Sequence, residues 1–117
     1  NIQATIQHRN PFVHSTLMIR AAAIRKEGSY NSFFKLAQDY ELELRYSRHH
    51  QLANLPEPVF EYVVNPSGNT VAKRAEQLTY HVWALLMHGD FATLSFYRGL
   101  FETLARWALA YSKALFG

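Results

Sequence analysis

The sequence predicts a mainly helical chain that begins with one β-strand, and two observations lead to this prediction. Residues 2–9 alternate strictly between apolar and polar side chains, as in a strand with one buried face. The later segments instead repeat their apolar residues every three or four positions, as amphipathic helices do. Because a lone strand is marginal in water, we expect it to pair with the same strand of a second copy.

The polar side of the predicted strand has an unusual composition. It carries two amides, a hydroxyl and a guanidinium, with no carboxylate among them. These side-chain types hydrogen-bond to base edges in the major groove of DNA. The predicted base-contacting residues are therefore Gln3, Thr5, Gln7 and Arg9.

Capping residues and apolar spacing predict four helices after the strand. Asn10-Pro11 starts a helix over 11–27, which Gly28 ends, and Ser29 caps a second helix over about 30–52. The prolines of 55–58 break the pattern, and residues 59–64 are expected to form a short strand or extended piece. Two further helices follow, one beginning near Thr70 and one after Gly89-Asp90 that is apolar around much of its circumference.

Charge divides the chain into two predicted parts. Residues 1–54 hold seven Lys and Arg against four Asp and Glu, whereas residues 55–117 hold five of each sign. The net charge of +3 therefore resides in the first part, as contact with phosphate groups requires. We expect a DNA-binding unit over 1–54 and a helical extension over 55–117 that serves dimerisation or partner binding.

The order strand, helix, glycine turn and capped helix in residues 1–52 resembles the ribbon-helix-helix family of DNA-binding dimers, typified by Arc and MetJ. The alternating strand, Pro11 and the run Ser29-Tyr30-Asn31-Ser32 carry this resemblance. It implies an intertwined homodimer whose two-stranded ribbon enters the major groove. It also implies that the start of the second helix anchors phosphate. The predicted phosphate contacts are Ser29, Asn31, Ser32 and Lys35.

The whole chain is also similar to AcaB-like regulators of conjugative plasmids and integrating elements, through the 55–68 linker followed by long helices. Together the two resemblances imply a cytoplasmic, sequence-specific transcriptional regulator. Its expected partners are double-stranded DNA and a second copy, with another regulator or RNA polymerase as a further candidate.

Two alternatives stay open. The chain could be a helical scaffold, for example of a secretion or conjugation apparatus, whose N-terminal strand pairs with a partner's sheet edge. The stretch from Arg45 to His50 is similar to the Arg and His pair of HEPN ribonucleases, in which these residues bind phosphate and transfer protons. In this chain Tyr46 follows the Arg, where that family prefers a polar residue.

The chain lacks the residues that several other functional classes require. The chain has no cysteine, which excludes disulfides, thiolate metal sites and cysteine nucleophiles. Its histidines do not have the spacing of a metal site, and it has no glycine-rich phosphate loop or nucleophile motif. We therefore expect no enzyme activity, no catalytic residue, no metal and no cofactor. No apolar run reaches the length of a membrane span, so we expect no membrane contact.

Overall fold

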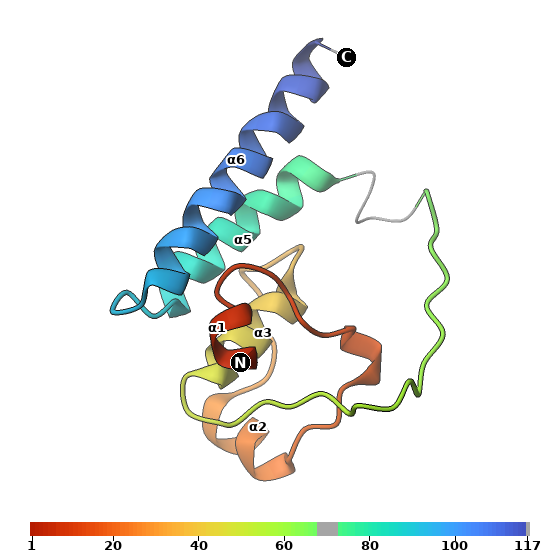
Figure 1. Cartoon of the computed structure of the whole chain (residues 1–117), viewed down its shortest axis with the longest axis vertical. Helices are drawn as coiled ribbons and strands as arrows, with labels where there is room; N and C mark the ends of the chain where they lie inside the picture. The colour runs from red at the N-terminus through yellow and green to blue at the C-terminus, as the bar shows by residue number, and fades with distance from the viewer. Residues whose placement is uncertain (68–72, 117) are drawn as a thin grey trace.

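A computed structural model describes residues 1–67 and 73–116, and this part of the chain is helical without a β-strand (Figure 1). Its helices, including the short 3-10 helix η1, are α1 Ile2–Thr5, η1 His14–Thr16, α2 Ala21–Glu27, α3 Gln38–Ser47, α5 Arg74–His88 and α6 Leu94–Phe116. The predicted N-terminal strand is therefore wrong, and so is the ribbon-helix-helix fold built on it. A ribbon needs two paired strands, whereas residues 2–5 form a helical turn.

The N-terminal segment is helical because Asn1 caps it. The Asn1 side-chain oxygen accepts a hydrogen bond from the Gln3 backbone N–H at 3.0 Å, which satisfies one of the free donors at the helix start. Ile2 and Ile6 lie four positions apart, so they share one face in a helix as well as in a strand. Ile6 is fully buried, and the Tyr40 hydroxyl donates to its carbonyl at 2.8 Å.

The next two predicted helices are shorter than expected. In place of one helix over 11–27, the chain forms η1 and then α2, which ends at Gly28 as predicted, with a positive φ of 82°. In place of a helix over 30–52, residues 28–37 form a loop and α3 begins at Gln38. Asn10 and Asn31 do accept hydrogen bonds from nearby backbone N–H groups, at Phe12 and Phe33, but each closes a turn that no helix continues.

The two C-terminal helices form as predicted. α5 and α6 lie side by side as a hairpin (Figure 1). Gly89 ends α5, and the Asp90 side chain accepts a hydrogen bond from the Ala92 backbone N–H in the connecting turn. The expected start of α5 near Thr70 lies outside the described residues.

One hydrophobic core joins the two predicted parts of the chain. Its members come from the residue after α1, from the loop before α3, from α3 itself and from the α5–α6 hairpin: Ile6, Phe34, Ala37, Tyr40, Leu44, Ala84, Leu85 and Phe96. A smaller cluster of Ala23, Leu42 and Tyr46 packs α2 against α3. Residues 1–54 therefore complete their core with α5 and α6.

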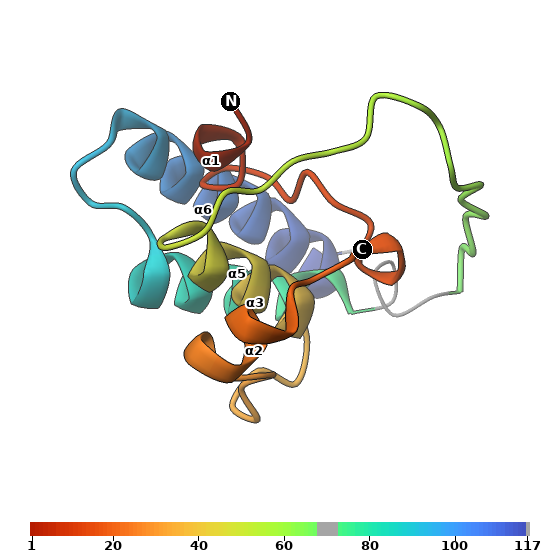
Figure 2. The ribbon, with the colours of Figure 1, turned by 90° about the horizontal axis from the view of Figure 1, so that it is seen from below.

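Residues 53–67 run outside this core. Both views show this segment swinging wide of the helices (Figures 1 and 2). Every residue from 53 to 67 is exposed, and Asn54 donates a hydrogen bond to the Pro11 carbonyl at its beginning. Residues 59–64, expected as a short strand or extended piece, belong to no helix or strand. We call residues 53–67 the arm.

Candidate functional site

Two carboxylates lie inside the protein on the same helix. The Glu41 and Glu43 side chains of α3 are 0% and 3% exposed. Acidic side chains are almost never fully buried without a partner, because desolvating a charge is costly. A cation that pairs with Glu41 or Glu43 is not free to bind a ligand, so the partners of these two carboxylates determine which cations can do so.

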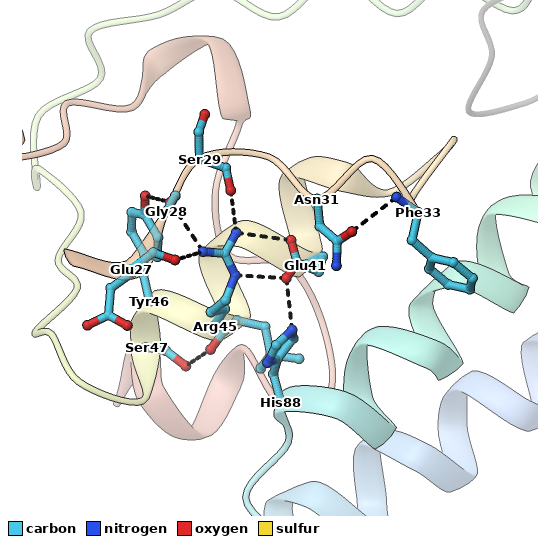
Figure 3. A network of polar contacts seen from close by, with 11 residues as sticks. Glu27, Gly28, Ser29, Asn31, Phe33, Glu41, Arg45, Tyr46, Ser47 and His88 are labelled. Carbon is cyan, nitrogen blue, oxygen red and sulfur yellow. Dashed lines mark hydrogen bonds and ion pairs between the residues drawn. The ribbon is translucent and has the colours of Figure 1, made fainter. Parts of the chain in front are cut away.

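Glu41 lies at the centre of a polar network that ties three segments together (Figure 3). Arg45 Nε donates to Glu41 Oε1 at 2.8 Å, and His88 Nε2 at the end of α5 lies 2.8 Å from the same oxygen. Burial by itself would raise the pKa of Glu41, but the contacts with His88 and Arg45 outweigh it and hold the pKa below its ordinary value. Glu41 is therefore an ionised anchor for Arg45 and His88.

The Arg45 guanidinium also binds the loop that follows α2. Its Nη atoms donate to the backbone carbonyls of Glu27, Gly28 (3.2 Å) and Ser29 (2.7 Å), and Nη2 also donates to Glu41 Oε2 (Figure 3). A guanidinium has five N–H donors, and these contacts with the Nε bond use all of them. Arg45 therefore holds the fold together at this position.

His50, the other residue of the ribonuclease alternative, pairs with an acid. Its Nε2 lies 3.0 Å from Glu27 Oε1. A phosphate-binding pair needs a cation that can turn towards the substrate, and Arg45 points inward at Glu41. These contacts give the ribonuclease alternative no support.

The second buried carboxylate, Glu43, has fewer polar partners than Glu41. His14 Nδ1 lies 3.1 Å from Glu43 Oε1, and His14 Nε2 lies 2.6 Å from the Tyr30 hydroxyl. The other oxygen, Oε2, has no hydrogen-bond partner among the described residues. Burial raises the pKa of Glu43 and nearby Asp39 adds to this, although His14 and Asn10 oppose it. Nothing in the sequence pattern pointed to Glu43, since only the fold brings His14 and Tyr30 to it.

A groove of about 570 Å³ lies between α2, α3 and the residues before them. Its walls are largely apolar, from Phe12, Leu17, Ile19, Leu42 and Leu52. Its polar lining includes Arg20, Glu43, His49 and His50. Arg20, just before α2, and Ala23 of α2 line this groove, and α2 lies at one end of the molecule (Figure 1).

Six cations of residues 1–54 are exposed, and we refer to them together as the basic surface. It consists of Arg9, Arg20, Arg25, Lys26, Lys35 and Arg48. By contrast, three of the four acids in this half are withdrawn from the surface, because Glu41 and Glu43 are buried and the Glu27 side chain is only 12% exposed. The outside of this half is therefore more positive than its sequence count indicates.

The four predicted base-contacting residues do not form a row. Gln3 donates to the His50 carbonyl, and Thr5 donates to the Asn1 carbonyl within α1. Gln7 is 4% exposed, and its side-chain oxygen accepts a hydrogen bond from the Asp90 backbone N–H at 3.0 Å. Arg9 alone among them is exposed. Without a strand, these side chains have no common outward face.

The predicted phosphate contacts lie in the loop between α2 and α3. Ser29, Ser32 and Lys35 are exposed and Asn31 is partly buried. The helix start expected behind them lies further along the chain, at Gln38, so this loop has no helix dipole directed at it. Lys35 keeps its charge available at the surface.

Comparison with protein-family models, curated proteins and solved structures finds no match for this chain. Across residues 1–67 and 73–116, no group of three or more acidic or histidine side chains is placed to hold a metal ion. No helix in this part of the chain is both long enough and apolar enough to cross a membrane.

Proposed function

We propose that this chain binds double-stranded DNA, as part of a transcriptional regulator, through the basic surface of residues 1–54. The observation that carries the proposal is the separation of charge: three of the four acids of this half are withdrawn from the surface, and six of its seven Lys and Arg are exposed. Phosphate binding depends on such cations, since each contact releases counterions from the DNA. In this proposal the cations replace the ribbon as the element that meets DNA.

The α2 region is the part of the basic surface best suited to this role. Arg20, Arg25 and Lys26 fall within seven residues, and all three are exposed. None of these side chains takes part in the Glu41–Arg45 network that holds the fold (Figure 3). They can therefore be changed without disturbing the core.

A salt series tests the proposal. Fluorescence anisotropy with a labelled 30-base-pair duplex of random sequence measures affinity between about 50 and 200 mM salt. We expect affinity to fall steeply with salt. The Arg25→Gln/Lys26→Gln variant should reduce the slope of log affinity against log salt by about 1 for each phosphate group that it no longer binds. Arg98→Gln/Lys113→Gln is the matched control, because it also removes two exposed cations, both on α6.

Two results would contradict DNA binding through this surface. One is a chain that fails to bind the duplex even at 50 mM salt. The other is an equal loss of affinity in Arg25→Gln/Lys26→Gln and in Arg98→Gln/Lys113→Gln, which would indicate attraction by overall charge.

A second candidate function, a helical interaction protein, is favoured by a separate observation. Large apolar side chains remain exposed on α6 and on the arm, as at Phe101 and Val63. Extensive exposed apolar surface marks contact sites with other macromolecules. A chain that self-associates but shows no salt-dependent DNA binding would favour this candidate.

A further inference from the structure

Helix α6 has one face that packs on the rest of the protein. Phe96, Gly99 and Thr103 on this face are buried, and α6 contacts both α5 and α1. Trp107 belongs to the same side, where its indole N–H donates to the Thr79 hydroxyl of α5 at 2.9 Å. One side of α6 therefore makes the buried contacts with the rest of the protein.

A second face of α6, beside the packed one, carries a continuous apolar row, which we call the outer seam; at its inner edge Tyr111 contacts Trp107, with ring centroids 4.9 Å apart. Its residues follow one another at steps of three and four positions through three heptads, and all are exposed: Leu94, Tyr97, Phe101, Leu104, Ala108, Tyr111 and Leu115. An alternation of three and four is the repeat by which two helices pack along their length. Phe101 in the middle is 73% exposed and Leu94 at one end is 85% exposed.

The charges on α6 do not oppose pairing with an identical face. Arg98 Nε donates to Glu102 Oε1 at 2.7 Å, so these two charges offset each other. Lys113, between Tyr111 and Leu115, is also exposed. In two identical helices that run antiparallel, the two Lys113 side chains lie at opposite ends of the pair, further apart than the roughly 10 Å over which salt screens a charge.

We propose that α6 is a dimerisation helix, and that two copies of the chain pair antiparallel along their outer seams. In this arrangement Phe101 faces the partner's Leu104, and Tyr97 faces the partner's Ala108. Large side chains then oppose smaller ones in successive layers, as tight helix packing requires. This inference does not rest on the proposed function, because the seam contains no residue of the basic surface.

The position of α6 favours the antiparallel arrangement. Its C-terminal part extends beyond α5, whereas its N-terminal part lies against the rest of the protein (Figure 1). Antiparallel pairing places each projecting end over the partner's N-terminal turns. In this register Leu94, which is 85% exposed, lies opposite the partner's Tyr111.

The area of the seam suits a stable dimer. Aromatic side chains can each bury about 150–250 Å², and the seam has three of them beside three leucines, which gives on the order of 800 Å² per copy after correction for partial exposure. Stable protein interfaces bury about 800 Å² on each partner.

Sedimentation of the full chain tests the proposal. We expect a concentration-dependent dimer in the wild type, and at least a tenfold rise of its dissociation constant in Phe101→Glu, which places a charge in the seam. Phe60→Glu is the matched control, because Phe60 is a half-exposed phenylalanine of the arm. Circular dichroism of both variants should show unchanged helix content. Because the seam is apolar, association should not weaken as salt rises, unlike the proposed DNA binding.

The absence of cysteine allows a single label to test the orientation. With a nitroxide on Ser112→Cys, antiparallel pairing between Phe101 and Leu104 separates the two labels by about 30 Å, given a rise of 1.5 Å per residue. Parallel pairing would bring them within about 15 Å of each other. The longer distance is the expected result.

Several outcomes would overturn the proposal. They are a wild type that stays monomeric at 100 μM, a dimer that dissociates in Phe60→Glu but not in Phe101→Glu, and a short distance between the two labels. A monomer that floats with phosphatidylcholine and phosphatidylglycerol vesicles would assign the seam to a lipid surface instead.

Discussion

Gly99 of α6 lies directly against the backbone carbonyl of Gln7, so closely that a Cβ at Gly99 would overlap this carbonyl. The Gln7 side chain meanwhile accepts a hydrogen bond from the Asp90 backbone N–H. Both the backbone and the side chain of Gln7 are thus held by the α5–α6 hairpin. This double attachment explains why a residue predicted to face DNA is buried.

We predict that Gly99→Ala destabilises the protein by about 1–3 kcal/mol, since an added methyl group must displace the backbone of residues 7 and 8. The usual gain in helix propensity from glycine to alanine, about 1 kcal/mol, would be outweighed. Urea unfolding followed by circular dichroism measures the change. Ser112→Ala, at an exposed position of the same helix, should change stability by less than about 0.5 kcal/mol. Equal stability of Gly99→Ala and wild type would show that the two segments do not touch.

A second prediction concerns the buried carboxylate of α3. Glu41→Gln should lower the free energy of unfolding at pH 7 by about 3–5 kcal/mol, because Arg45 and His88 would keep their positions without the balancing charge. Since the pKa of Glu41 is lowered, its stabilising effect is present above the ordinary pKa of 4.5 and disappears as the pH falls. The difference between variant and wild type should therefore shrink in acid.

Glu43→Gln is the control for this prediction. Glu43 lies two residues further along the same helix and is also buried, but its pKa is raised and one of its oxygens has no partner among the described residues. Removing its charge should cost much less at pH 7. Equal destabilisation by the two substitutions would contradict the anchoring role of Glu41.

The helices with many periodic residues could be predicted from the sequence, whereas in the first 52 residues the N-terminal helix and the starts of α2 and α3 could not. α6 repeats its apolar spacing over 23 residues, and a pattern of this length fits a helix and not a strand. The N-terminal segment, residues 2–9, offers only eight residues, in which Ile2 and Ile6 fit a strand and a helix equally well. The capping bond from Asn1 and the burial of Ile6 under Tyr40 decide in favour of the helix.

The polar network was beyond sequence reasoning for a related reason. Arg45 and Glu41 are four residues apart on one helix, so their pairing could be foreseen. His88, however, is 47 positions from Glu41 along the chain, and only the packing of α5 on α3 brings it there. Arg45 points inward in the same packing. The spacing between an Arg and a His in the sequence does not show in which direction the Arg side chain points.

A third prediction follows from the exposure of the arm. Limited chymotrypsin treatment of the native protein should cut first at Phe60 or Tyr62, because both are exposed in a segment without helix or strand hydrogen bonds. The two fragments should still elute together in gel filtration without denaturant, because one core contains Ile6 and Leu44 from one side of the cut and Leu85 and Phe96 from the other. Fragments that separate under these conditions would mean that each half folds alone.

The fourth prediction concerns acid stability and His81. The His81 ring stacks on Tyr40, with ring centroids 4.3 Å apart and an angle of 14° between the planes. Burial lowers the pKa of His81 from 6.5 to about 4, with Arg74 and Arg106 acting in the same direction and Asp39 against them. Between pH 6.5 and pH 4 the unfolded chain therefore binds a proton that the folded chain does not bind. Stability should fall across this range as the pH is lowered.

We expect His81 to account for a loss of at most about 3 kcal/mol between pH 6.5 and pH 4, because each pKa unit corresponds to about 1.4 kcal/mol and part of the ring remains exposed. His81→Phe keeps an aromatic ring on Tyr40 and has no proton to bind, so its stability should fall less over the same range. Urea unfolding at half-unit pH steps measures both curves. His49→Gln, at an exposed histidine after α3, should follow the wild type. If His81→Phe also follows the wild-type curve, the acid sensitivity arises from the carboxylates and His81 does not contribute to it.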